Sequence, residues 1–217
     1  MKKMNYVFLL LCCLMTFQIQ AQITIGVKGG YTNAWENYGD VRDLLPEDAE
    51  INIDGFNVSL IAQYQIGNRF NIGLEPGLTR RGAACFPGWN LVSPSPIFQD
   101  NDWNLSYVEL PVIASYSQPI IKNSLDVVGK LGGGIAYLVK GTEIWNSDSS
   151  EPSSRPITDE VNRWDYGIHT GVDIRKHLGK HQIVLGTDVY VAFKDVDQFI
   201  TSKNRSIDIN LGYLYTL

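Results

Sequence analysis

Residues 107–116, YVELPVIASY, restrict the folds open to this chain more than any other stretch. Apolar side chains recur at every second position from Val108 to Tyr116, and this period predicts a strand because alternate side chains of a strand share one face. Glu109 falls on the opposite face, in the middle of an otherwise apolar segment. A strand with one face against lipid and the other lining a closed barrel accommodates both observations. We therefore expect Glu109 to point into a barrel lumen.

Seven further segments show the same two-residue period. Each is about as long as the roughly 9–11 residues with which a tilted strand crosses a bilayer. The predicted strands are residues 23–32, 55–65, 70–80, 103–116, 125–140, 164–175, 181–193 and 205–217.

The connections between these segments alternate in length. Long connections span residues 33–54, 81–102, 141–163 and 194–204, and short ones span 66–69, 117–124 and 176–180. Outer-membrane barrels have an even number of strands, short periplasmic turns and longer outer loops. The sequence therefore predicts an all-β fold: an eight-stranded antiparallel up-and-down transmembrane β-barrel in the cell outer membrane.

The first 21 residues have the pattern of an export signal. Lys2 and Lys3 precede a short apolar run at 6–17, and Ala21 offers a small residue for cleavage. The apolar run is too short for a spanning helix. We predict a signal peptide at 1–21 and a single barrel domain at 22–217.

The cysteines support no alternative anchor or crosslink. Cys12 and Cys13 follow Leu10 and Leu11, which lack the small residue that lipoprotein processing requires. Cleavage after Ala21 leaves Cys85 alone, so the mature chain has no intramolecular disulfide. A loop thiol without a catalytic role is the favoured interpretation of Cys85.

The charge of the mature chain excludes one class of partner. The whole chain has 18 basic and 23 acidic side chains, and loss of Lys2 and Lys3 leaves a net charge of −7. An acidic chain without a basic patch argues against nucleic acid. Acidic side chains in the long connections invite a cation site, but no EF-hand spacing is present. The segment 147–156, SDSSEPSSRP, is too polar to bury a core and is expected to be mobile.

Charged residues on the inward faces should form a structural lumen cluster. Its predicted members are Lys28, Glu75, Glu109, Lys130, His169, Asp188 and Asp208. Counting back from a turn centred near residue 120 places Glu109 level with Lys130, and Glu75 at a similar depth. The same counting places His169 near Asp188, and Lys28 near Asp208 or Asn210.

A catalytic interpretation of this cluster is the alternative. Two carboxylates beside a lysine are able to do acid–base chemistry, and His169 with Asp188 suggests a hydrolase. No nucleophile-elbow pattern accompanies them, and a small barrel needs such pairs to fill its lumen. We expect no catalytic, cofactor-binding or metal-binding residue and no cofactor.

Other residue types add detail to the barrel hypothesis. Pro76 and Pro111 each remove a ladder donor and predict a bulge or local opening, and Gly132 to Gly134 allow a bend. Aromatic residues near the strand ends predict interfacial girdles: Tyr31, Tyr64, Phe70, Trp103, Tyr116, Tyr137, Trp164, Phe193, Tyr213 and Tyr215.

Across the mature chain the sequence resembles the PorT-like outer-membrane β-barrel proteins of Gram-negative bacteria. The resemblance is carried by residues 20–22 (QAQ), 25–32 (IGVKGGYT), 107–116 (YVELPVIASY), 129–139 (GKLGGGIAYLV) and 204–215 (NRSIDINLGYLY). Such barrels commonly end on an aromatic residue, whereas Thr216 and Leu217 follow Tyr215 here. The resemblance implies an eight-stranded barrel in the outer membrane, and it supplies no catalytic residues. The namesake of the family is associated with a protein-secretion apparatus, but most members have no assigned activity.

The leading functional hypothesis is a non-enzymatic envelope, assembly or secretion-associated component that acts through its extracellular loops. Its expected partners are outer-membrane lipid and lipopolysaccharide, the barrel-insertion machinery and secretion-system proteins. Three alternatives remain: an outer-membrane lipid-modifying enzyme using His169 or the Glu75/Glu109 pair, a soluble lipocalin-like ligand-binding barrel, and a narrow channel.

Overall fold

The computed structural model describes residues 22–38, 52–84, 100–147, 150–197 and 201–217. Nearly all of them lie in strands: β1 (Ile23–Tyr38), β2 (Asn52–Ile66), β3 (Phe70–Leu74), β4 (Gly77–Ala83), β5 (Asp100–Ile121), β6 (Leu125–Ser147), β7 (Ser150–Pro156), β8 (Trp164–Leu178), β9 (His181–Asp195) and β10 (Ser202–Thr216). Within these ranges no helix is long and apolar enough to cross a membrane. The predicted signal peptide and Cys85 lie outside the described residues.

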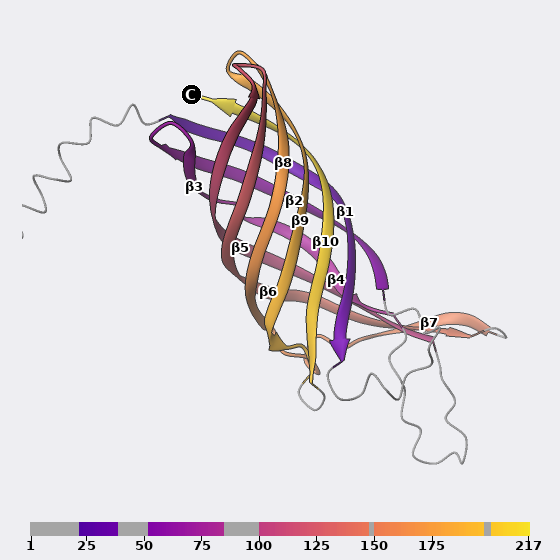
Figure 1. Ribbon diagram of the computed structural model, residues 1–217. Coiled ribbons are helices and arrows are strands. Elements are labelled where there is room, and N and C mark those ends of the chain that lie inside the picture. Colours follow the sequence, from indigo (N-terminus) through magenta and orange to yellow (C-terminus); the bar gives the residue numbers. More distant parts are fainter. Residues whose placement is uncertain (1–21, 39–51, 85–99, 148–149, 198–200) are drawn as a thin grey trace, which may run out of the picture.

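The strands close into one antiparallel ring (Figure 1). β3 and β4 share one position in it, because both pair with β2 on one side and with β5 on the other. The ring continues through β6, β8, β9 and β10. β1 pairs with β10 from Thr24–Thr216 to Tyr38–Ser202 and closes the seam. The eight-stranded up-and-down barrel predicted from the sequence is confirmed.

The two strand prolines lie on the same inter-strand seam, which limits their effect on the sheet. Pro76 interrupts the ladder between β3 and β4, as predicted, without changing the register of β2. Pro111 lies opposite this interruption, between the pairs Leu74–Val112 and Gly77–Glu109, and it stays paired with Gly134 of β6. The Pro111 carbonyl accepts from the Glu75 amide, so its missing N–H faces the interrupted strand and not β6.

Side chains on the two faces of the ring differ sharply in chemistry. Val108, Leu110 and Val112 point outward with 44–46% of their surfaces exposed in the isolated chain, whereas the intervening Glu109 is 8% exposed. The outer surface is apolar on the other strands too, and many inward side chains are charged or amides. A soluble lipocalin-like barrel has the reverse arrangement, so that alternative is wrong.

Three strands extend beyond the ring at the end with the long connections, here called the outer end. β5 spans 22 residues and β6 spans 23, and β7 pairs with the far end of β6. This projecting sheet is visible at the lower right of Figure 1. Segment 147–156 was predicted to be mobile, whereas Ser150–Pro156 forms the strand β7. Backbone pairing with β6 orders this stretch without requiring an apolar core.

An apolar cluster lies inside the outer end of the barrel. Ile157, Val161 and Val196, from connections after β7 and β9, pack with buried residues of β5 and β6. Trp103 belongs to this cluster, and its indole Nε1 donates to Glu143 at 3.3 Å. The prediction that Trp103 joins an interfacial girdle is therefore wrong, because Trp103 shares the inward face of β5 with Tyr107.

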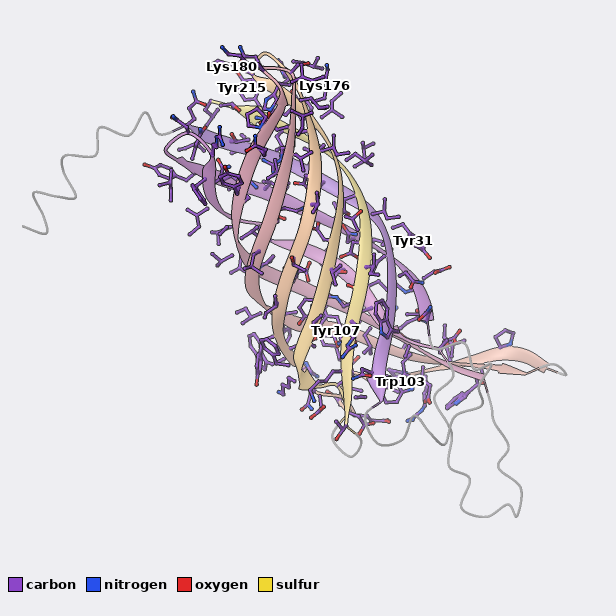
Figure 2. The ribbon with its side chains drawn as sticks, in the orientation of Figure 1. Tyr31, Trp103, Tyr107, Lys176, Lys180 and Tyr215 are labelled. Atoms are coloured by element: carbon purple, nitrogen blue, oxygen red, sulfur yellow. The ribbon has the colours of Figure 1, made fainter. Side chains whose placement is uncertain are left out.

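Outward aromatic residues pair near both ends of the barrel. Tyr137 and Trp164 have ring centroids 4.9 Å apart at the outer end, and Phe70 and Tyr116 have the same separation at the other. In Figure 2, Lys176, Lys180 and Tyr215 lie at the end with the short turns, and Trp103 and Tyr107 lie toward the opposite end. Two aromatic bands bounding an apolar belt are typical of a membrane barrel.

Candidate functional site: the lumen charge network

Seven polar side chains form a closed chain of contacts across the lumen, here called the lumen network. Its members are Lys28, Gln63, Glu75, Lys130, Asp173, Arg175 and Asp188. They come from β1, β2, the junction of β3 and β4, β6, β8 and β9. The network therefore ties together strands that are not neighbours in the ring.

Asp188 is the centre of one half of the lumen network. Its Oδ2 accepts from Lys28 Nζ at 2.8 Å and its Oδ1 from Lys130 Nζ at 2.6 Å. Asn210 Nδ2 donates to the same Oδ2 at 3.0 Å. Lys28 also reaches Glu75 at 2.5 Å. One carboxylate thus pairs with two buried ammonium groups, from β1 and β6, which lie two strands away from β9 on either side.

Arg175 completes the other half. Lys130 Nζ lies 2.5 Å from Asp173 Oδ1, and Arg175 Nη2 lies 3.0 Å from Asp173 Oδ2. Arg175 Nη1 donates to Gln63 Oε1 at 3.1 Å, and Gln63 Nε2 contacts Glu75 at 3.5 Å. The three cations and three carboxylates of the lumen network balance, as buried charges must if they are to be tolerated.

A second ion pair lies closer to the outer end. Arg81 on β4 is 1% exposed, and its Nη2 donates to Glu109 at 2.5 Å. Its guanidinium carbon lies 3.8 Å from the Tyr190 ring centroid and 5.9 Å from that of Tyr107. Stacking on two aromatic rings compensates part of the lost hydration of the guanidinium.

Little space remains inside the barrel between these groups. A cavity of about 20 Å³ is lined by all seven residues of the predicted cluster. That volume holds about one water molecule. Toward the short-turn end the lumen widens into a polar vestibule of about 310 Å³, with Gln63 and Arg175 among its lining residues.

The pairing predicted within the cluster is wrong in its central part. Glu109 lies opposite Ala136, six positions from Lys130, and binds Arg81 instead. The cause is the β5–β6 turn, which falls at residues 122–124 and not near residue 120. Asn123 adopts a φ of 58° there, a conformation that asparagine tolerates well. Glu75 lies opposite Pro111, and it binds Lys28 and not Lys130.

Two other predictions hold in part, because Lys28 and Asn210 both donate to Asp188 Oδ2, and His169 and Asp188 line one cavity. His169 lies opposite Tyr190 in the register, with ring centroids 4.7 Å apart, while Gly171 takes the position opposite Asp188. Lys28 lies opposite Gly212 and extends across the lumen to Glu75 and Asp188, leaving Asp208 opposite Thr32. Long side chains in a narrow barrel reach across it, which counting between adjacent strands does not capture.

Arg81, Asp173 and Arg175 are among the charged lumen residues that the predicted cluster omitted. Asp173 and Arg175 share the inward face of β8 with His169, so the period of that strand signals them. Arg81 was assigned to a long connection, but β4 continues to Ala83. Among the described residues, no group of three or more His, Cys, Asp or Glu side chains is placed to hold a metal ion.

An apolar exterior, a filled polar lumen and a seam closed between the first and last strands define a transmembrane β-barrel of the outer-membrane class. The chain belongs to the family of outer membrane protein beta-barrel domains, whose model matches residues 18–198. It is accordingly a protein of the outer membrane.

Solved outer-membrane barrels share this fold. The chain is similar to a major outer membrane protein from Thermus thermophilus, with a TM-score of 0.53, 12% identity, and coverage of 92% of this chain and 100% of that one. Ail from Yersinia pestis has a TM-score of 0.42 and 17% identity, with coverage of 91% of this chain and 100% of that one. OprG from Pseudomonas aeruginosa has a TM-score of 0.46 and 9% identity, with coverage of 89% of this chain and 95% of that one. At these identities the likeness concerns the fold alone. A comparison with curated protein sequences gave no match.

Proposed function

We propose that the protein is a non-enzymatic envelope component that acts through its outer surface, with the barrel serving as a closed membrane anchor. The lumen network carries this proposal, because side chains that bridge the barrel leave a cavity of about 20 Å³ between the mid-lumen charges, beyond the vestibule at the short-turn end. The enzyme alternative finds less support. His169 packs on the Tyr190 ring, and the hydroxyl of the adjacent Thr170 donates to the Lys130 carbonyl at 3.1 Å.

The projecting sheet of β5, β6 and β7 is the best candidate for the acting surface. Arg155 on β7 pairs with Glu143 at 2.7 Å and with Glu160 at 2.5 Å, and it lies 5.5 Å from the Trp145 ring centroid. The hydrogen bond from Arg155 to Glu143 raises the pKa of the Arg155 guanidinium above its ordinary value. These contacts hold the sheet in a defined shape, as a docking surface requires.

The PorT-like resemblance gives the proposal a finer form. In that form the partner is a component of a secretion or assembly apparatus in the envelope, and lipopolysaccharide and the barrel-insertion machinery are the other contacts. Residues 1–21 would act as the export signal, so the mature protein would begin at Gln22. An intact-mass measurement on protein from the outer membrane checks that start.

Surface labelling tests the proposed orientation. We expect a membrane-impermeant maleimide to label Ser153→Cys on intact cells, because β7 lies outside the ring. Ser124→Cys lies in the β5–β6 turn and should react only after the outer membrane is permeabilised. Both variants carry Cys85→Ser to remove the native thiol. Labelling of Ser124→Cys but not Ser153→Cys on intact cells would overturn the orientation and, with it, the proposal.

Conductance separates a closed anchor from a narrow channel. In a planar bilayer we expect no unitary current steps from the wild-type barrel, because the lumen network occupies the cross-section. A sixteen-stranded porin in the same membrane serves as the positive control, since barrels of that size enclose an aqueous channel. Unitary steps whose ion selectivity reverses in Lys130→Glu would instead establish the channel alternative.

A further inference from the structure

Three outward residues lie in one row across β4, β5 and β6. Arg80 pairs in register with Ser106, and Ser106 pairs with Lys140. Neighbouring strands are about 4.8 Å apart, so the Cα atoms of Arg80 and Lys140 are separated by roughly 10 Å. The side chains of Arg80 and Lys140 are long enough, at this Cα separation, for the guanidinium and the ammonium to converge on one anion above the Ser106 hydroxyl.

The two cations of this row are available to a ligand. Among the described residues, the ion pairs closer than 4.0 Å do not involve Arg80 or Lys140. Arg80 Nε donates to Asn104 Oδ1 at 2.8 Å, which fixes the guanidinium without neutralising it. Asp54 on the neighbouring β2 strand accepts from Tyr31 and Asn33 on its other side. The row is therefore a positively charged patch on an acidic protein.

The surface below the row is apolar. Leu78 and Val108 pair with each other on the same outward face, two residues nearer the membrane centre than Arg80 and Ser106. They are 47% and 45% exposed in the isolated chain. Val108 pairs in turn with Tyr137 of the outer aromatic band. A lipid whose phosphate is held by the row would thus have its acyl chains lying directly on the barrel wall.

The depth of the row fits the outer headgroup region. Ser106 lies ten residues from Tyr116, whose ring belongs to the aromatic band at the short-turn end. Ten residues span roughly 33 Å along a strand, and a tilt of about 40° reduces this to roughly 25 Å, the height of the apolar belt of such barrels. The row therefore marks the outer edge of the belt, on the side of the long connections.

We propose that Arg80, Ser106 and Lys140 bind a phosphate of lipid A on the lipid-facing wall of the barrel. A phosphorylated glycolipid matches this surface in charge, in the order of its polar and apolar parts, and in its location in the outer leaflet. The proposal rests on the outer-membrane orientation proposed above, and it adds a defined lipid site.

Lipid binding in detergent solution tests the site, independently of location or partner in the cell. Native mass spectrometry compares diphosphoryl lipid A with phosphatidylglycerol for the wild type, Arg80→Gln/Lys140→Gln and the matched control Lys122→Gln/Lys176→Gln, whose lysines lie at the short-turn end. Because charge-assisted contacts to phosphate are lost, we expect roughly tenfold weaker lipid A binding in the first variant alone. A heat-modifiable gel shift verifies that each variant is folded.

Two results would overturn the site. One is lipid A affinity in Arg80→Gln/Lys140→Gln equal to that of the wild type. The other is phosphatidylglycerol binding as strong as lipid A binding and lost in the same variant, which would mean that the row recognises any anionic lipid. If Ser153→Cys is not labelled on intact cells while lipid A still binds in detergent, the proposed orientation and function fail, and only the chemical preference of the row for lipid A remains.

Discussion

Asp188→Ala is expected to lower the free energy of unfolding of the barrel by about 3–5 kcal/mol, the usual cost of removing one partner from a buried ion pair. Asp188 pairs with both Lys28 and Lys130, and its side chain is 13% exposed. Without it, two ammonium groups in the lumen share only Glu75 and Asp173. Urea titration of the protein in lipid vesicles, followed by tryptophan fluorescence, measures the loss.

Two variants make this result specific to buried charge. Asp188→Asn keeps the side-chain volume and one acceptor oxygen, but it replaces the other acceptor with an NH2 donor and removes the charge, so it should recover only part of the stability. Asp159→Asn removes the partner of Arg163 at an exposed site outside the lumen, where an ion pair contributes at most about 1 kcal/mol. A loss below about 1 kcal/mol for Asp188→Ala would show that lumen water solvates the two lysines.

Val112→Arg should be the most damaging single substitution on the outer wall. Val112 points outward near the middle of the apolar belt, and an arginine facing lipid at the bilayer midplane costs about 2–4 kcal/mol. The same change in a soluble barrel would place a charge in water at almost no cost. Unfolding in vesicles, compared with unfolding in detergent micelles, gives the size and the origin of the effect.

Gln118→Arg is the matched control for Val112→Arg. Gln118 lies on the same outward face of β5, beyond Tyr116 and near the short-turn boundary, where an added arginine costs about 0–1 kcal/mol. Equal losses at the two positions would contradict the placement of β5 across the bilayer. Together the pair measures the depth of β5 without reference to the loops.

The sequence is sufficient to predict the barrel because its signal is local. Alternation along each strand separates Glu109 from Val108 and Leu110, and the connection lengths alternate along the whole chain. Both follow from one constraint, since every strand crosses the same bilayer. Ser150–Pro156 escapes this logic because β7 lies beyond the ring and pairs with the far end of β6, where no bilayer constrains its sequence.

The lumen contacts are not predictable in the same way. Their positions depend on where each turn falls, and a shift of three residues in the β5–β6 turn separates Glu109 from Lys130 by six positions. They also join non-adjacent strands, as Lys28 does with Glu75 and Asp188. Which charges are inside follows from the period, whereas which ones touch requires three-dimensional structure.

The position of Lys28 has a consequence for assembly. Lys28 is on the first strand, yet its partners lie 47 and 160 residues further along the chain. Contacts between residues so far apart in sequence form late in folding, because the chain must lose loop-closure entropy before the contact energy is gained. While β1 is undocked from β10, Lys28 stays beside Glu75 because β1 and the strands that flank Glu75 all pair with β2, but Asp188 on β9 lacks Lys28 and has only Lys130. We infer that joining the seam and completing the contacts of Asp188 are one cooperative event, so a half-assembled barrel lacks the ion pair that ties β1 to β9.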